Sequence, residues 1–235
     1  MLRLAEKMSR LGTETAFDVL ARAETLAQEG RDIINLGIGQ PDFKTPEHIV
    51  EAAIKALHDG HHGYTPSPGI PHLRESVARD LATYRGVNVA PDRIVIVPGG
   101  KVTMFFAILM FGEAGVDILY PNPGFPIYQS VIEFTGARAV PVRLLEENDF
   151  SFDAETILSQ ITEDTRLLIL NSPANPTGGA ASKTEMDRLV AGLTDRHPQV
   201  AVLSDEIYCR ITYDNREHIS LLSYPELDDR LILLD

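Results

Sequence analysis

Short apolar runs alternate with amphipathic segments along most of this chain. The clearest run is Val-Ala-Val-Leu at residues 200–203, which turns polar at Asp205 and Glu206. A continuous apolar run bounded by polar residues is typical of a strand buried on both faces of a parallel sheet. The same pattern predicts further strands at residues 93–97, 117–120, 139–144, 166–170 and 230–234.

Helical patterns occupy the intervals between these strands. We expect helices at residues 13–29, 46–58, 71–85, 126–135, 154–160 and 182–195, and an apolar run at 102–111. Thr45 as N-cap with Pro46 as first residue predicts the start of the second helix, and Ser182 with Glu185 forms a capping box for the last. This alternation predicts an α/β fold, a mostly parallel sheet with helices on both faces.

Length and charge limit the classes of function. The 235 residues, 44% of them apolar, suffice for one large α/β domain or for one domain with a smaller piece. A net charge of −13 makes nucleic acid and anionic membranes poor partners. The single cysteine, Cys209, excludes an internal disulfide and a multi-cysteine metal site.

The two ends of the chain bear on its cellular location and on whether it is part of a longer protein. The opening residues lack the apolar core of a signal peptide, and no apolar run reaches the roughly 18 residues of a membrane span, so we expect a soluble, cytoplasmic protein. Residues 1–12 are expected to form a loose arm. The chain stops at Asp235, directly after an apolar strand. We expect an N-terminal portion of a longer protein; the alternative is a natural C-terminal strand.

Candidate site residues follow the predicted strands, where open α/β sheets bind their ligands. In VPGGK (97–101), two glycines allow a tight turn and backbone N–H groups at a helix start can face an anion, although neither GxxxxGK[ST] nor GxGxxG is present. The alternative is a plain strand-to-helix turn. In NSPANPTG (171–178), Asn175 offers an amide, and Asn175-Pro176 is a candidate for a cis bond. An ordinary turn is the alternative there.

Three further side chains complete the set. Phe125, in PNPGF, is placed either to stack on a flat ligand or to fill the core. Asp205 is a buried carboxylate that needs a positive or hydrogen-bonding partner, and Tyr208 follows three residues later. An anion-binding turn at Gly100 and Lys101, a flat surface, an amide and a carboxylate together suit a planar phosphorylated heteroaromatic with a basic ring nitrogen. Pyridoxal phosphate is that molecule.

The chain resembles the class I/II aminotransferases of the pyridoxal-phosphate fold type I group. The matching segments are NLGIGQPDFKTP, YTPSPGIPHLRE, VPGGK, YPNPGFPIY, NSPANPTG and VLSDEIY, within residues 33–235. The resemblance implies a large cofactor-binding domain, incomplete at its C-terminus, at 46–235. It implies an N-terminal arm, part of a small domain, at 1–45. The implied activity is transfer of an amino group between an amino acid and a 2-oxo acid.

The resemblance also implies roles for individual residues. Asp205 would pair with the protonated pyridine nitrogen, Tyr208 and Asn175 would bind the phenolic oxygen, and Phe125 would stack on the ring. Gly100 and Lys101 would bind the phosphate through backbone N–H groups. Tyr64 would reach the phosphate of a neighbouring subunit, which implies a homodimer with shared sites, and Gly39 would approach the substrate α-carboxylate. No metal ligand is implied.

The Schiff-base lysine of the family is expected beyond Asp235, so we expect no catalytic residue in this chain and no transamination by the polypeptide as given. Two alternatives stay open. One is a lyase or decarboxylase on the same scaffold. The other is a non-catalytic module that retains cofactor binding or dimerisation.

Overall fold

The computed structural model describes residues 3–12 and 15–235, which form two compact units. Residues 15–71 form one unit, with α1 (Thr15–Gln28) and α2 (Glu47–His58). Residues 3–12 and 72–235 form the other, which holds both hydrophobic core clusters. The start of the first predicted helix, at 13–14, and the first two residues of the predicted arm lie outside the described residues. The domain boundary between residues 45 and 46 stays a prediction.

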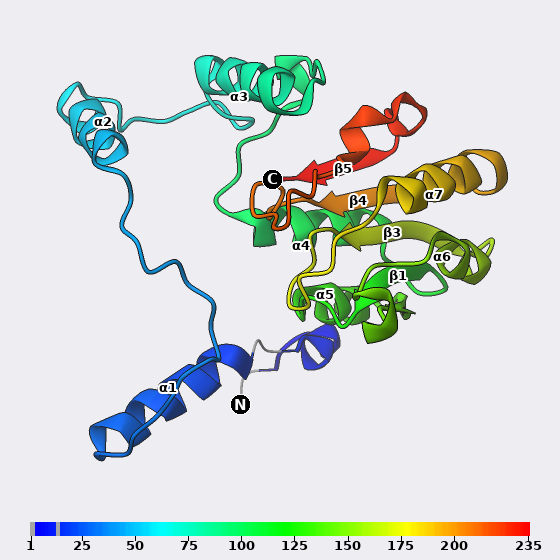
Figure 1. Ribbon diagram of the computed structural model, residues 1–235, viewed down its shortest axis with the longest axis horizontal. Coiled ribbons are helices and arrows are strands. Elements are labelled where there is room, and N and C mark those ends of the chain that lie inside the picture. The colour runs from blue at the N-terminus through cyan, green and yellow to red at the C-terminus, as the bar shows by residue number, and fades with distance from the viewer. Residues whose placement is uncertain (1–2, 13–14) are drawn as a thin grey trace. The chain divides into compact units, whose positions relative to one another are not determined.

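The larger unit is built on a five-stranded, all-parallel sheet in the order β2-β1-β3-β4-β5 (Figure 1). Its strands are β1 (Asp117–Asn122), β2 (Arg138–Arg143), β3 (Thr165–Asn171), β4 (Ala201–Asp205) and β5 (Leu231–Leu234). This confirms the predicted α/β class. The remaining elements of the unit are α3 (Pro71–Arg85), α4 (Gly100–Phe111), α5 (Ile127–Thr135), α6 (Ala154–Gln160), α7 (Lys183–Arg196) and five short 3₁₀ helices, η1 (Glu6–Arg10), η2 (Pro91–Arg93), η3 (Glu146–Asn148), η4 (Leu221–Ser223) and η5 (Pro225–Leu227).

Alternate side chains of the central strands face opposite layers. Leu168 and Val202 pack in one core cluster with residues of α6 and α7. Ile169 and Leu203, one position further along each strand, pack in the other cluster with residues of α4 and α5. This is the period-two alternation of a strand, here with both faces apolar and covered. Burying each such side chain stabilises the fold by about 1.5–3 kcal/mol.

The strand order reverses direction at β1. The chain passes from β1 to β2 on one side and then returns to place β3 on the other side of β1. The connecting helices α5 and α7 accordingly lie on opposite faces of the sheet. Such a reversal opens a crevice at the carboxyl ends of the strands, where α/β proteins bind ligands. The predicted site residues that follow β1, β3 and β4 lie along this edge.

Residues 7–12 contact α5 through three side-chain and backbone groups, so the prediction of a loose arm is wrong for them. Arg10 Nη2 donates to the carbonyl oxygen of Phe134 at 3.2 Å, and the N–H of Gly12 donates to Ser130 Oγ at 2.9 Å. The ammonium of Lys7 lies 5.1 Å from the centroid of the Phe134 ring. These contacts join residues more than a hundred positions apart, and no local sequence pattern reports them.

The strand predicted at 93–97 is also wrong. Ile94 is extended (φ −104°, ψ 130°), but residues 94–97 belong to no strand of the sheet. A groove of about 330 Å³ separates them from Leu231 and Leu233 of β5. Paired strands lie about 4.8 Å apart, and in the part of the chain described the only strand paired with β5 is β4. The apolar pattern of this segment predicts an extended backbone but not a hydrogen-bonded neighbour, and Val95 is 61% exposed.

The helix starts predicted from the sequence agree only in part with those in the structure. Pro46, in an extended conformation, is the N-cap of α2, so the assignment of Thr45 as N-cap is wrong. Ser182 caps α7 as predicted, its Oγ accepting from the N–H of Glu185 at 3.2 Å. The carboxylate of Glu185 instead accepts from the N–H of Ala154 at 2.8 Å and so joins α7 to α6. None of the helices described combines the length and apolar character that crossing a bilayer requires.

Candidate functional site

Asp205 ends β4 with its carboxylate enclosed by protein. The residue is 2% exposed. The Tyr128 hydroxyl donates to Oδ2 at 2.5 Å, and the N–H of Ile207 donates to Oδ1 at 3.4 Å. Burial raises the pKa of Asp205 above its ordinary value, although both hydrogen bonds act in the opposite direction. Both donors are neutral, so this carboxylate retains the capacity to attract a cation.

Tyr128 is the functional candidate that sequence reasoning missed. It lies in the first turn of α5 and is fully buried. Burial and the neighbouring Asp205 carboxylate raise its pKa far above the ordinary tyrosine value, so its hydroxyl stays protonated and donates. The available signal was its position three residues after Phe125 in YPNPGFPIY. An aromatic residue in a predicted helix otherwise indicates only core packing.

Phe125 and Lys101 extend this group of contacts. The Phe125 ring meets Tyr128 edge-on, with centroids 6.0 Å apart and an interplanar angle of 81°. The ring is half-buried. Lys101 Nζ lies 5.7 Å from the centroid of the same ring. A partly exposed aromatic face therefore lies beside the Tyr128–Asp205 pair.

The start of α4 lies at the same edge of the sheet. Gly99 is its N-cap, with φ 90° and ψ 153°, a conformation open essentially to glycine alone. A Cβ on Gly100 would lie 3.2 Å from Leu234 Cδ1, and Leu234 pairs with Asp205 across the sheet. The first N–H groups of a helix have no acceptor within it and carry its positive dipole end. This helix start can therefore bind an anion next to the end of β4.

A pair of asparagines joins the ends of β3 and β4. Asn171 Nδ2 donates to the carbonyl oxygen of Asp205 at 3.0 Å, and Asn171 Oδ1 accepts from the N–H of Asn175 at 2.7 Å. Asn171 is a second residue that the sequence analysis did not select. The Asn175–Pro176 bond, the candidate named from the sequence, is cis, and Asn175 is half-buried. The loop after β3 is thereby tied to the end of β4.

The structure brings six sequence-predicted residues into one region and leaves two in the other unit. Tyr208 is half-buried in the turn after β4, close enough to contribute to the raised pKa of Tyr128. With it belong Gly100, Lys101, Phe125, Asn175 and Asp205. Tyr64 and Gly39 are exposed residues of the 15–71 unit. The individual roles of all eight residues stay predictions.

The arrangement offers complementary groups to one kind of ligand. It combines a buried carboxylate, a half-buried aromatic ring and a helix N-terminus at one sheet edge. These groups respectively favour a cation, a flat ring face and an anion. A flat molecule with a protonated ring nitrogen and a phosphate carries all three features.

Comparisons with known proteins give one consistent result. The family model for aminotransferase class I and II matches residues 31–234. The aspartate aminotransferase of Bacillus subtilis (strain 168) is 33% identical over 230 residues, which are 98% of this chain and 57% of that protein. A solved aspartate aminotransferase from Thermus thermophilus with maleate aligns with a TM-score of 0.91 at 32% identity, over 99% of this chain and 60% of the other. An alanine aminotransferase from Pyrococcus furiosus aligns with a TM-score of 0.85 at 32% identity, over 93% of this chain and 55% of the other. The chain thus spans somewhat more than half the length of these relatives.

Proposed function

The chain belongs to the class I and II aminotransferase family, and from this we propose that it forms the cofactor-binding part of an enzyme that transfers an amino group between an amino acid and a 2-oxo acid. The observation that carries the proposal is the enclosed carboxylate of Asp205 at the end of a central parallel strand, held by neutral donors. The matching relatives named as aminotransferases favour amino transfer over the lyase and decarboxylase alternatives.

Enzymes of this family depend on pyridoxal phosphate, and the residues present fit that group. The fit rests on this chain's own features. Asp205 is a buried carboxylate whose described partners are uncharged, and Gly99 and Gly100 leave the start of α4 without side chains. A protonated pyridine nitrogen would satisfy the first, and a phosphate the second.

Each residue of the site then has a proposed task. Asp205 holds a proton on the ring nitrogen, and Tyr128 fixes the carboxylate that does so. Asn175 and Tyr208 bind the ring's phenolic oxygen, Phe125 covers one ring face, and the backbone of Gly100 and Lys101 binds the phosphate. When bound, pyridoxal phosphate supplies an electron sink for the electrons released as the substrate loses its α-proton.

The substrates belong to the proposal as well. Relatives named for aspartate and for alanine make these two amino acids the first donors to test, with a 2-oxo acid as acceptor. We propose that the backbone of Gly39 approaches the α-carboxylate shared by all such donors. That contact involves no side chain, so it would not distinguish one amino acid from another.

We also propose a homodimer in which Tyr64 of one subunit reaches the cofactor phosphate of the other. An exposed apolar surface on α4 supports association: Phe106 is 57%, Leu109 41% and Met110 66% exposed, on a helix whose other face is buried. Apolar side chains grouped in this way mark interaction surfaces more often than isolated ones do. A cytoplasmic location is part of the same proposal.

A binding experiment tests the core of the proposal. The purified chain is titrated with pyridoxal phosphate, and binding is followed by the absorbance of the cofactor. We expect saturable binding that weakens at least about tenfold in Asp205→Asn, because the variant cannot pair with a cationic ring nitrogen. Asp228→Asn is the matched control: Asp228 pairs with Arg93 on the surface, away from the site. Binding that is absent, or equal in the two variants, would refute the proposal.

A further inference from the structure

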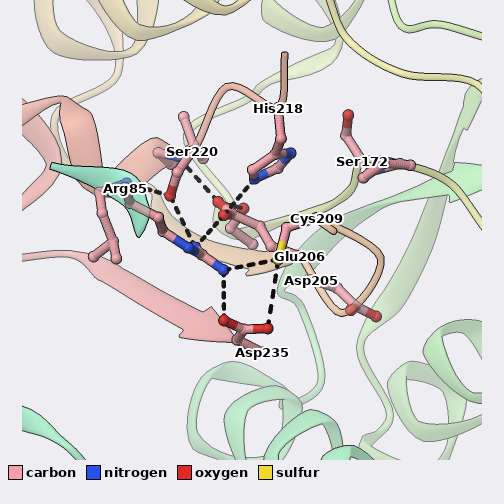
Figure 2. A network of polar contacts seen from close by, with 12 residues as sticks. Arg85, Ser172, Asp205, Glu206, Cys209, His218, Ser220 and Asp235 are labelled. Atoms are coloured by element: carbon pink, nitrogen blue, oxygen red, sulfur yellow. Dashed lines mark hydrogen bonds and ion pairs between the residues drawn. The ribbon is translucent and has the colours of Figure 1, made fainter. Parts of the chain in front are cut away.

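Glu206, the residue after Asp205, is the centre of a buried polar cluster (Figure 2). Its side chain is 1% exposed. Arg85 Nη1 donates to Oε2 at 2.5 Å, and His218 Nε2 lies 2.7 Å from the same oxygen. The carboxylate of Glu206 therefore has close partners from α3 and from the loop before η4.

The second oxygen of Glu206 is equally well satisfied. Oε1 accepts from Ser204 Oγ at 2.9 Å and from the N–H of Leu221 at 3.0 Å. Burial alone would raise the pKa of Glu206, but the hydrogen bond with His218 and the charge of Arg85 bring it below the ordinary value. Glu206 is thus an ionised carboxylate with its hydrogen-bonding capacity taken up inside the protein.

Arg85 extends the cluster to two more parts of the chain. Its Nη1 donates to Ser220 Oγ at 3.1 Å, and its Nη2 donates to Asp235 Oδ2 at 2.6 Å and to Cys209 Sγ at 3.3 Å. Through Arg85, the carboxylate of Glu206 is connected to α3, the turn after β4, the loop before η4 and the residue after β5. Disturbing it would release several of these segments together.

The backbone around Glu206 is shared with Asp205. The N–H of Glu206 donates to the carbonyl oxygen of Leu234 at 2.8 Å, and its own carbonyl accepts from the N–H of Cys209 at 2.8 Å. In the same turn, between Glu206 and Cys209, the N–H of Ile207 donates to the Asp205 carboxylate. Figure 2 shows the Asp205 side chain pointing away from the cluster, as expected for adjacent residues of an extended strand. The two carboxylates therefore use opposite sides of one short piece of backbone.

We propose that Glu206 is a positioning residue for Asp205: anchored by Arg85, His218, Ser204 and Leu221, it fixes the end of β4 and the following turn so that Asp205 stays buried where it meets the cofactor. The inference rests on the proposed function, in which the Asp205 carboxylate meets the cofactor. Asp205 is the partner the ligand would use, and Glu206 is held entirely by the protein. A fixed anchor on one face would keep the carboxylate on the other face in place without touching the ligand.

The experiment follows the titration of the Asp205 carboxyl by ¹³C NMR in the chain without added cofactor. Its resonance is identified by its absence from Asp205→Asn. Two titratable groups act on it: Tyr128 donates a hydrogen bond to it, and the charge of Glu206 raises its pKa. Tyr208 acts on Tyr128. In Glu206→Gln and in Glu206→Asp, which is too short to keep all its contacts, we expect the pKa of Asp205 to fall toward that of an ordinary aspartate, because the released turn admits water. Asp228→Asn, which breaks an exposed arginine–carboxylate pair, should leave it unchanged.

Two outcomes with folded variants overturn the proposal. An unchanged Asp205 titration in Glu206→Gln, with only a lower unfolding midpoint, would make Glu206 merely structural. A shift in Glu206→Gln but none in Glu206→Asp would assign the effect to charge rather than position. If neither variant folds, Arg85→Lys keeps a cation but cannot contact Glu206 and Asp235 at once, as Nη1 and Nη2 of the arginine do. It should give a smaller shift in the same direction; no shift there refutes the inference. Failure of the wild-type chain to bind pyridoxal phosphate would count against the proposed function alone, because the titration needs no cofactor.

Discussion

The hydroxyl of Tyr128 donates a 2.5 Å hydrogen bond to the carboxylate of Asp205, and both side chains are buried. The two residues come from α5 and β4, 77 positions apart in the sequence. The hydrogen bond stabilises the charged form of Asp205, while burial destabilises it. Burial is the larger of these two opposing effects on the pKa of Asp205.

Removing the donor should make the carboxyl harder to ionise. In Tyr128→Phe, we expect the pKa of Asp205 to rise, because the hydrogen bond that favours the anion is lost while the burial remains. Affinity for pyridoxal phosphate should fall by about tenfold or more, the usual effect of losing a hydrogen bond to a charged group. ¹³C NMR titration and cofactor titration measure the two effects. Tyr224→Phe is the control, since Tyr224 donates a 2.6 Å hydrogen bond to Asp187 on the surface. A pKa that falls or stays constant in Tyr128→Phe would contradict this account.

Replacing Asp205 by asparagine should stabilise the chain in the absence of cofactor. The folded-state pKa of Asp205 is raised above the ordinary value of 3.8. The folded state therefore binds the proton more tightly, and its stability falls as pH rises from the unfolded-state pKa through the folded-state pKa. Asp205→Asn removes this penalty and keeps an oxygen that can accept from Tyr128.

We expect a gain in the free energy of unfolding on the order of 1 kcal/mol at pH 7, disappearing below pH 3.8. Urea unfolding at the two pH values measures it. A loss of stability at pH 7 would show that the carboxylate contributes to folding and not only to binding.

Asp117, at the opposite end of the sheet, should behave in the reverse way. Arg138 Nε donates to Asp117 Oδ1 at 2.6 Å, its Nη2 forms an ion pair with Oδ2, and Thr162 Oγ1 donates to Oδ2 at 3.1 Å. The hydrogen bond from Arg138 lowers the pKa of Asp117 below its ordinary value, in spite of burial. Its contribution to stability is therefore present above the unfolded-state pKa and is lost as pH falls through the folded-state pKa.

Asp117→Asn should cost about 1.5–3 kcal/mol at pH 7, as for other hydrogen bonds to charged groups. The difference from wild type should shrink in acid, as measured by urea unfolding. Because Asp117 starts β1, at the edge away from the candidate site, binding of pyridoxal phosphate should be unaffected once the variant is folded. A weakened cofactor affinity would place Asp117 in the binding machinery.

The central part of the site could be predicted because its signals are local. The apolar run that ends at Asp205 predicts a buried strand and the place where it stops, and β4 runs from Ala201 to Asp205. The turns after β1 and β3 are likewise marked by their own proline and glycine residues. In a parallel sheet, the ends of all strands meet at one edge, so knowing where each strand stops was enough to group these residues.

The parts that could not be predicted depend on contacts distant in sequence. Tyr128 resembles any buried aromatic residue of a helix until Asp205 is placed beside it. Arg85 and Glu206 each resemble ordinary surface charges in their own segments, yet their side chains are 3% and 1% exposed. Residues 94–97 have the composition of a strand, but a strand also requires a hydrogen-bonded neighbour. The sequence pattern indicates the local backbone conformation of a segment and not which distant residues it meets.

A side chain at Gly99 should strain the backbone. Its φ of 90° with ψ 153° strains any L residue by about 1–3 kcal/mol, so Gly99→Ala should lower the free energy of unfolding by that amount. It should also weaken binding of pyridoxal phosphate, because relief of the strain would turn the first N–H groups of α4. Gly115→Ala is the matched control, with φ 89° in a turn before β1. Stability should fall in both variants and cofactor affinity only in Gly99→Ala; equal affinities would separate this turn from phosphate binding.

The exposed apolar face of α4 should determine the oligomeric state. Met110, 66% exposed, and Phe106, 57% exposed, lie one turn apart on a helix whose other face packs in the core. A charge placed between two copies would be desolvated without a partner, so Met110→Glu should convert a dimer to a monomer at micromolar concentration. Leu145→Glu, at a 43% exposed apolar residue after β2, is the control and should leave the dimer intact. Sedimentation equilibrium measures the mass of each species. If Met110→Glu remains dimeric while folded, the subunits associate through another surface, and the contact proposed for Tyr64 must be sought there.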